Sequence, residues 1–500
     1  MRLFCVKMKE ERDESYGHVL KYTGVFGGVQ GLNVLIGLVR NKIVALLLGP
    51  GGMGLVSLFN TSMQLISQTT NLGISFSAVR HISEYYNAGD TEKAAHYVKV
   101  VRGWCLLTAL LGMFVCVAVG PFLSDATFSW GNHSLHFILL APAIGMLAIT
   151  GGETAILKGQ RKLGALAWVQ IIAAVASLVI SIPIYYIFRQ TGIVPVIVLM
   201  AFVTMCATLW FSLRIYSLQL SGSRGILGEG MEMVRLGVAF TLAGIVGSAG
   251  EMVIRSYLNV VGNLDVVGLY NAGYLITIIY AGMVFSAMET DYFPRLSGVN
   301  QNIEQTNFTV NRQMEVSLLI VSPMLTALVA LLPVLIPQLF TSEFLPVVPM
   351  AQVAALAMFF KVLTLPVAYI TLARGYSMKY LILETAYAVV FVLLIVFGYQ
   401  HWDLLGTGIA ITLAHVFDCL MINIYAYKKY GYRFSITVFR YAVVLFSLGF
   451  LAYACTILLD GIVYWMVELF LVLVSTLFSV RILRDKTHLW QALTRRLRKD

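Results

Sequence analysis

The stretch RNKIVALLLGPGGMGLVSLFN, residues 40–60, decides the fold because it is one half of an internal repeat. Its counterpart is RSYLNVVGNLDVVGLYNAG, residues 255–273. Further matches continue along the chain at a nearly constant offset of about 215 residues. The matched anchors are Arg40 with Arg255, Gly54 with Gly268, Arg80 with Arg295, Lys158 with Arg374, and Gly159 with Gly375. An offset this steady indicates a duplicated structural unit.

The composition is typical of a helical membrane protein. Hydrophobic residues make up 59% of the 500 residues and charged residues 12%, about half the charged fraction of a soluble domain. Apolar windows of about twenty residues, the length that crosses the hydrocarbon core, recur along the chain. We therefore predict an all-α polytopic membrane protein with about fourteen transmembrane helices. The predicted spans are 22–48, 54–79, 101–120, 135–157, 164–187, 192–213, 236–260, 266–289, 314–336, 346–372, 380–398, 404–427, 438–458 and 461–481.

The repeat divides these spans into two pseudo-symmetric six-helix bundles, residues 22–218 and 236–430, and two additional helices within 431–482. A charged N-terminal segment (1–21), a polar linker (219–235) and a basic interfacial tail (483–500) complete the chain. Basic residues gather on one set of predicted loops, so the positive-inside rule places the linker, the tail and both termini in the cytoplasm. The same rule accounts for the net charge of +10 without a nucleic-acid partner.

The sequence favours a transporter. Repeats related by an axis along the membrane normal place a substrate site between the two halves. The six cysteines show neither metal-ligand spacing nor a disulfide framework. There is also no GxxxxGK[ST] nucleotide loop. We expect no catalytic residue, metal or cofactor.

The segment LLGPGGMGLVSLFNTSMQLISQTTNLGISFSAVRHISEYYNAGD, residues 47–90, resembles the opening of the polysaccharide transporter family. This family comprises the Wzx-type flippases of lipid-linked oligosaccharides within the multidrug/oligosaccharidyl-lipid/polysaccharide (MOP) exporter superfamily. The resemblance implies a V-shaped pair of bundles that alternates between inward-open and outward-open states. It also implies a substrate made of polyprenyl diphosphate and an O-antigen, capsule or exopolysaccharide repeat unit. The bacterial inner membrane, and a polysaccharide polymerase with chain-length machinery as partners, are further implications.

Two intramembrane arginines are candidates for binding a diphosphate. Arg40 and Arg255 occupy equivalent positions, and a guanidinium offers phosphate oxygens a planar fork of donors. Lys42 points to nearly the opposite helical face from Arg40 and is expected to extend to the interface. The alternative is that the arginines are structural, because Glu251 lies one turn before Arg255.

Polar side chains recur on one face of the second predicted span. Asn60, Gln64, Gln68 and Asn71 are spaced by four, four and three residues, and such a stripe must face protein or water within a membrane. The amides are expected either to bind sugar hydroxyls or to join neighbouring helices. Gln30 and Asn33 of the first span are candidates for the same substrate site.

Lys361 lies near the middle of its predicted span, and the equivalent residue of the first half is Gly145. A lysine at this depth predicts a functional site, here substrate binding, or a pair with a carboxylate of another helix. Asp418 and His415 share one helical face and, with Glu251, are candidates for ion coupling; a structural pair is the alternative. Interfacial exposure is the simplest interpretation of Glu153, Glu289, Asp291 and Glu384, and the sequence predicts no role for Glu468.

The predicted function is therefore translocation of a lipid-linked oligosaccharide from the cytoplasmic to the outer leaflet by alternating access, within a membrane whose lipids hold the polyprenyl tail. One alternative is a multidrug or organic-cation antiporter of the same superfamily, which should have an acidic, aromatic cavity. A second alternative is a membrane glycosyltransferase or polymerase, which usually needs a large extramembrane loop with clustered carboxylates.

Overall fold

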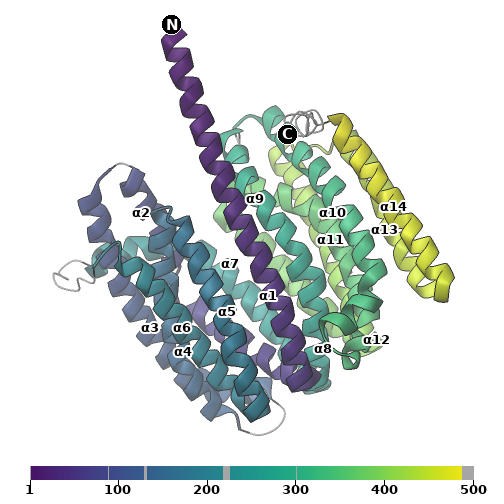
Figure 1. Ribbon diagram of the computed structural model, residues 1–500, viewed down its shortest axis with the longest axis horizontal. Helices are drawn as coiled ribbons and strands as arrows, with labels where there is room; N and C mark the ends of the chain where they lie inside the picture. Colours follow the sequence, from purple (N-terminus) through teal and green to yellow (C-terminus); the bar gives the residue numbers. More distant parts are fainter. Residues whose placement is uncertain (1, 88, 129–131, 218–225, 300, 487–500) are drawn as a thin grey trace, which may run out of the picture. The chain divides into compact units, whose positions relative to one another are not determined.

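The computed structural model describes residues 2–87, 89–128, 132–217, 226–299 and 301–486, and these residues form helices and no β-strand (Figure 1). This all-helical architecture confirms the predicted fold class. In hydrocarbon, a helix satisfies its backbone hydrogen bonds internally, which is why apolar segments of this length form helices. The described chain divides into two compact units.

The first unit comprises Met1–Gly52 and Leu58–Ser248. Its helices are α1 (Arg2–Thr70), α2 (Ile74–Asn87), α3 (Thr91–Thr127), α4 (Ser134–Gly159), α5 (Leu163–Phe188), the 3₁₀ turn η1 (Arg189–Gly192), α6 (Ile193–Leu213) and the first part of α7 (Ile226–Val261). The boundary between the units lies inside α7, not in the polar linker at 219–235.

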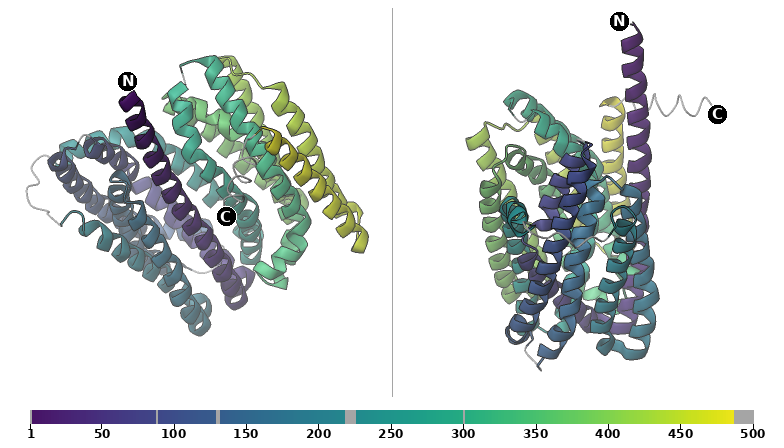
Figure 2. Two further views of the ribbon diagram at one scale, coloured as in Figure 1. Left: turned by 45° about the horizontal axis from the view of Figure 1, so that its top comes forward. Right: turned by 90° about the vertical axis from the view of Figure 1, so that its left-hand side faces the viewer.

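The second unit comprises Met53–Ser57 and Ala249–Asp500. It contains the rest of α7, α8 (Leu264–Tyr274), the π-helix η2 (Leu275–Tyr280), α9 (Ala281–Val299), α10 (Ile303–Leu339), the 3₁₀ helix η3 (Ser342–Val347), α11 (Val348–Ala373), α12 (Ser377–Tyr430), α13 (Ile436–Leu458) and α14 (Gly461–Lys486). Helices α13 and α14 pack side by side (Figure 2), and α14 also packs on α10. Residues 487–500, most of the predicted basic tail, lie outside the described residues.

Several long helices are interrupted where the sequence predicts two spans. Helix α1 is broken at Gly49 (φ 66°), next to Pro50, and α12 at Trp402 and Asp403. The predicted span 54–79 is wrong at its end: Leu72 and Gly73 adopt left-handed conformations that separate α1 from α2.

Among the residues that the structure describes, ten helical stretches are long and apolar enough to cross a membrane. Gly164–Leu213 (50 residues) and Ser377–Tyr430 (54 residues) each contain two predicted spans, and Gly31–Thr70 (40 residues) overlaps two more. Together with the long helix α7, this arrangement agrees with about fourteen spans.

The repeat-related glycines Gly54 and Gly268 meet inside the second unit. A Cβ atom on Gly54 would lie 2.1 Å from the carbonyl oxygen of Leu264 and 3.0 Å from the amide nitrogen of Gly268. Backbone atoms cannot move away as a flexible side chain can. Glycine at position 54 therefore permits the close crossing between α1 and α8, as small residues do in other membrane helix pairs.

We predict that Gly54→Ala lowers the free energy of unfolding by about 1–3 kcal/mol, because the added methyl group overpacks this crossing. The control is Gly282→Ala in α9, where an added Cβ meets nothing within 4 Å. Thermal unfolding of the purified proteins in detergent measures both effects. Equal melting temperatures for the two variants would contradict the prediction.

A buried ion pair ties the first unit together. Arg102 of α3 and Glu153 of α4 form two hydrogen bonds, Nε to Oε1 at 2.8 Å and Nη2 to Oε2 at 3.2 Å. Arg102 also donates to Ser212 and to the carbonyls of Tyr216 and Ser217. Glu153 is only 3% exposed, so its predicted interfacial exposure is wrong. Local spacing does not reveal this pair, because Arg102 reaches Glu153 from another helix.

We expect Arg102→Met to lower the free energy of unfolding by about 3–5 kcal/mol, because it leaves the buried carboxylate of Glu153 without its cation. Arg80→Met is the matched control: Arg80 and Glu84 form an ion pair at the surface, where such a pair contributes about 0–1 kcal/mol. Chemical or thermal unfolding of both variants provides the comparison. A similar loss in both would show that the buried network does not hold α3 to α4.

Candidate functional site

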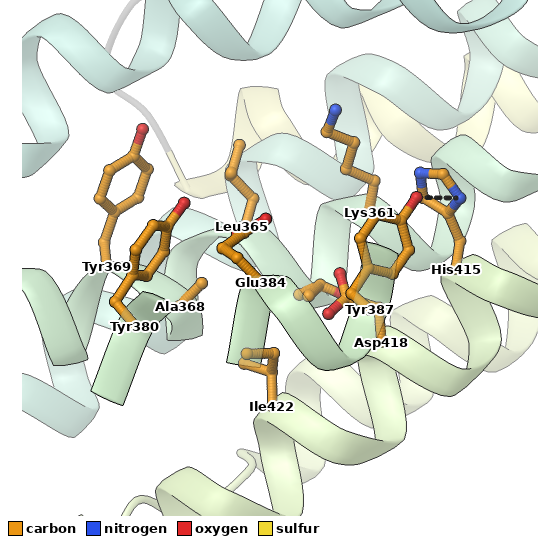
Figure 3. A pocket seen from close by; sticks show the side chains of 11 residues that line it. Lys361, Leu365, Ala368, Tyr369, Tyr380, Glu384, Tyr387, His415, Asp418 and Ile422 are labelled. Atoms are coloured by element: carbon orange, nitrogen blue, oxygen red, sulfur yellow. Dashed lines mark hydrogen bonds between the residues drawn. The ribbon is translucent and has the colours of Figure 1, made fainter. Parts of the chain in front are cut away.

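A cavity of about 220 Å³ in the second unit collects ionisable side chains from α11 and α12 (Figure 3). Lys361 lines it from α11, Glu384 and Tyr387 from the first part of α12, and His415 and Asp418 from the second part. The remaining lining residues are Thr364, Leu365, Ala368, Tyr369, Tyr380 and Ile422. We call this space the α11–α12 cavity.

Helical spacing explains why these side chains converge. Tyr380, Glu384 and Tyr387 are separated by four and three residues, and therefore share one face of α12. His415 and Asp418 are three residues apart and share a face of the second part of the same helix. The break at Trp402 and Asp403 allows both parts of α12 to contribute to the cavity.

The charges in the cavity are unequal in number. Lys361 interacts electrostatically with Glu384, Asp418 and His415. One ammonium group balances one carboxylate, and ionised groups held away from water need such balance. The second carboxyl group therefore needs a proton or another cation. Among the described residues, no group of three or more His, Cys, Asp or Glu side chains is arranged to hold a metal ion.

The hydrogen bonds of His415 fix its proton arrangement. Its Nδ1 lies 2.9 Å from the carbonyl oxygen of Ile411, and a carbonyl only accepts, so Nδ1 carries a hydrogen. The hydroxyl of Tyr387 is 3.5 Å from the same nitrogen (Figure 3), and its ring packs edge-on against the imidazole. The neutral tautomer thus keeps Nε2 as the site that accepts a proton.

The duplicated half does not contain this cluster. At an offset of 216 residues, which relates Gly159 to Gly375, the cavity positions correspond to Gly145, Trp168, Leu199 and Phe202. The first half of the sequence repeat has glycine or apolar residues at these positions, so the ionisable cluster is particular to the second half.

The two candidate arginines lie in different units and have different surroundings. Arg40 is half-buried in the first unit, beside the hydroxyl of Tyr185. Its Nε has no hydrogen-bond partner among the described residues. The guanidinium is thus held by fewer protein groups than that of Arg255.

Arg255 belongs to a buried network of the second unit. Its Nη1 lies 3.1 Å from Oε2 of Glu251, and its Nε donates to Oγ of Ser57 at 2.9 Å. Ser57 donates in turn to Asn271 at 2.9 Å. The guanidinium also lies 5.7 Å from the ring centroid of Tyr274. Of the three residues predicted to couple ions, Asp418 and His415 line the α11–α12 cavity together with Lys361. The third, Glu251, belongs instead to the network of Arg255.

The predicted amide stripe is partly uncovered. Asn60 and Gln64 are exposed on the first unit and make no hydrogen bond to a described residue, whereas Gln68 lies 3.1 Å from the Cβ position of Gly244. Asn71 bonds Ser75 of α2. On the first span, Asn33 donates to Gln170 at 3.0 Å. The side chain of Gln30 lies outside the described part of the chain.

Comparison with known proteins identifies the family. The model of a family described as "Polysaccharide biosynthesis protein" matches residues 19–300, more than half of the chain. The chain belongs to this family. No curated protein matches it in sequence.

The solved structures that resemble this member of the polysaccharide biosynthesis family are transporters of the MOP superfamily. "Lipid II flippase MurJ, inward closed conformation" has a TM-score of 0.69 and 14% identity, over 92% of this chain and 99% of that chain. An inward-facing MATE multidrug resistance transporter has a TM-score of 0.67 and 15% identity, over 82% and 98%. A MOP superfamily transporter from Pyrococcus furiosus, described as having a binding pocket of reverse polarity, has a TM-score of 0.55 and 17% identity, over 82% and 95%. At these identities, the likeness establishes the MOP fold.

The prediction that Glu384 is exposed at the membrane interface is wrong, because Glu384 lines the α11–α12 cavity. The residue lies toward one end of its predicted span, so its position along the helix suggested exposure. The signal that identifies it is its spacing from Tyr380 and Tyr387. The side chains of Glu289 and Asp291 lie outside the described part of the chain.

We predict that Lys361→Met destabilises the protein, because both cavity carboxyl groups then lack the ammonium group. The Glu384→Gln substitution removes one of these carboxylates. In the double variant, the loss in free energy of unfolding should therefore be smaller than the sum of the two single losses by about 0.5–3 kcal/mol. Thermal unfolding of the wild type, both single variants and the double variant measures this coupling.

The control for this cycle is Lys379→Met, which removes a lysine that lies over the ring of Tyr376, 4.1 Å from its centroid, and does not line the cavity. It should show no coupling to Glu384→Gln. Strict additivity of Lys361→Met and Glu384→Gln would contradict an electrostatic link across the cavity.

Proposed function

We propose that this chain is a flippase that moves a polyprenyl-diphosphate-linked oligosaccharide from the cytoplasmic to the outer leaflet of a bacterial inner membrane, with both termini in the cytoplasm. The observation that carries the proposal is the family match over residues 19–300, because it links a multi-pass membrane protein to polysaccharide biosynthesis. The MOP fold, shared with a lipid II flippase, supports the proposal. The glycan is an O-antigen, capsule or exopolysaccharide repeat unit, and a polysaccharide polymerase with its chain-length machinery would take the product.

In this proposal, the cationic side chains bind the diphosphate during alternating access. Arg40, Arg255 and Lys361 supply the positive charge, and a phosphate oxygen replaces Glu251 as the partner of Arg255. The amides of Gln30, Asn33, Asn60, Gln64 and Gln68 contact sugar hydroxyls. The exposure of Asn60 and Gln64 supports this role, since an uncovered amide in a membrane helix is stable only against water, substrate or other protein.

The energy can come from the membrane potential and from ion exchange. An inside-negative potential favours outward movement of an anion by about 2.3 kcal/mol per charge per 100 mV. Asp418, His415 and Glu251 are the proposed coupling groups. The excess carboxyl group of the α11–α12 cavity supports a coupling role there, because it needs a proton or cation whenever Lys361 balances its neighbour.

The direct test measures translocation of a labelled undecaprenyl-diphosphate oligosaccharide in proteoliposomes. We expect activity with the wild type and a loss of about tenfold or more in Lys361→Met and Arg40→Met, since a hydrogen bond to a charged group contributes about 1.5–3 kcal/mol. Lys379→Met, which lies outside the cavity, should retain activity. Full activity of Lys361→Met and Arg40→Met would remove these cations from the transport mechanism, and an inactive, correctly folded wild type would contradict the flippase.

One observation favours a second candidate, an organic-cation antiporter. The α11–α12 cavity is rich in tyrosine and carboxyl groups, as such an antiporter requires: Tyr369, Tyr380, Tyr387, Glu384 and Asp418 line it. Lys361 in the same cavity opposes this function, because it repels cations. Uptake of a fluorescent organic cation against a proton gradient, in the same proteoliposomes, separates the two candidates. Transport of the cation without the diphosphate lipid would establish the antiporter.

A further inference from the structure

Helix α14 turns a polar stripe towards α10, and none of its residues lines the α11–α12 cavity. Tyr464, Glu468, Ser475 and Ser479 are buried, with 8%, 1%, 0% and 2% exposure. Other positions of the same helix are apolar and exposed, among them Met466, Phe470 and Leu477. The spacing of four, seven and four residues places the buried set on one face. This face packs on α10, where the hydroxyl of Tyr464 donates to the carbonyl of Ala330 at 2.7 Å.

Glu468 has no hydrogen-bond partner for either carboxyl oxygen among the described residues, although both atoms are buried. The hydroxyls of Ser475 and Ser479 on its own helix, and of Ser322 on α10, are likewise buried without a partner in that part of the chain. A carboxylate in such a place would keep none of the hydrogen bonds that water gives it.

No basic side chain lies at this depth in the helices that pack on α14. Residues 316–339 of α10 contain no titratable residue. Residues 441–458 of α13 contain Tyr441, Tyr453 and Cys455, and residues 461–480 of α14 contain only Tyr464 besides Glu468. Cys455 and Tyr464 interact electrostatically with Glu468. Both become anionic when they ionise, so neither can balance a carboxylate.

These contacts are compatible only with the uncharged form of the side chain, because an isolated carboxylate in hydrocarbon costs several kcal/mol. We propose that Glu468 is a proton-binding site that controls the docking of α14 on α10. The neutral acid fits the dry interface, and loss of its proton separates the two helices so that water can reach the carboxylate. This site is independent of the proposed transport function.

A hydrophobic carbodiimide tests for the proton. The acid gives its proton to a carbodiimide nitrogen while its oxygen bonds to the central carbon, and the O-acylisourea rearranges to a stable N-acylurea without a leaving group. We expect dicyclohexylcarbodiimide to modify Glu468 in full-length protein in liposomes, with labelling that falls severalfold as the pH rises over about 5–9, the range in which buried glutamates can titrate. Peptide mass spectrometry locates the adduct.

Two comparisons make the labelling decisive. Glu468→Gln should remove this adduct, whereas Glu343→Gln, which changes an exposed acid of η3, should leave it unchanged. Modification of Glu384 or Asp418 shows that the reagent has entered the membrane-embedded part of the protein. Labelling of either of these residues without any adduct on Glu468 would overturn the proposal.

The accessibility of α14 tests the consequence of losing the proton. The Ser475→Cys substitution places a thiol at a fully buried position of the interface. Alkylation of this thiol, measured by mass spectrometry of the peptide that contains it, shows when the interface is exposed. At each pH, the alkylation rate is divided by the rate in the unfolded protein, which corrects for ionisation of the thiol. We expect this corrected rate to rise severalfold as the pH increases. In the Ser475→Cys/Glu468→Gln double variant, the corrected rate should stay low at every pH. An equal rise in both backgrounds, or none in either, would show that Glu468 does not control the docking.

Discussion

The membrane-spanning part of this protein depends on one constraint: an ionisable side chain in hydrocarbon must be neutral, paired or in contact with water. Different helices meet it in different ways. Arg102 of α3 and Glu153 of α4 form an ion pair. Arg255 forms an ion pair with Glu251 and donates a hydrogen bond to the hydroxyl of Ser57. In each network, residues distant in sequence complete what one helix leaves unsatisfied. The positions of charges therefore determine which helices must stay together.

The two halves of the sequence repeat differ in their distribution of charge. The ionisable cluster around Lys361 in the second unit corresponds to glycine, tryptophan, leucine and phenylalanine in the first. The buried pair of Arg102 and Glu153 occurs in the first unit, and residues 318 and 369, at an offset of 216 residues, are leucine and tyrosine. The sequence repeat therefore does not extend to the positions of the buried charges.

Part of the candidate site follows from residue type and depth. Lys361, His415 and Asp418 stand out because charged or titratable groups near the middle of a span are rare. Glu384 was misassigned because depth is a poor guide near the end of a span; helix packing decides that the face it shares with Tyr380 and Tyr387 lines the cavity. Glu468 had no assigned role for a related reason: sequence gives its depth in α14, but not the burial of both its oxygens against α10.

The sequence by itself determined the all-helical membrane class, the approximate spans and the duplication. Hydrophobic length and steady anchor spacing are properties of the chain that do not depend on how its helices pack. Only the tertiary structure decided that Ser57 of α1 joins Arg255 and Glu251 of α7, and that Lys361 shares a cavity with Glu384 and Asp418. These outcomes depend on which faces of α1, α7, α11 and α12 meet, and contacts between distant segments are set by packing rather than by local periodicity.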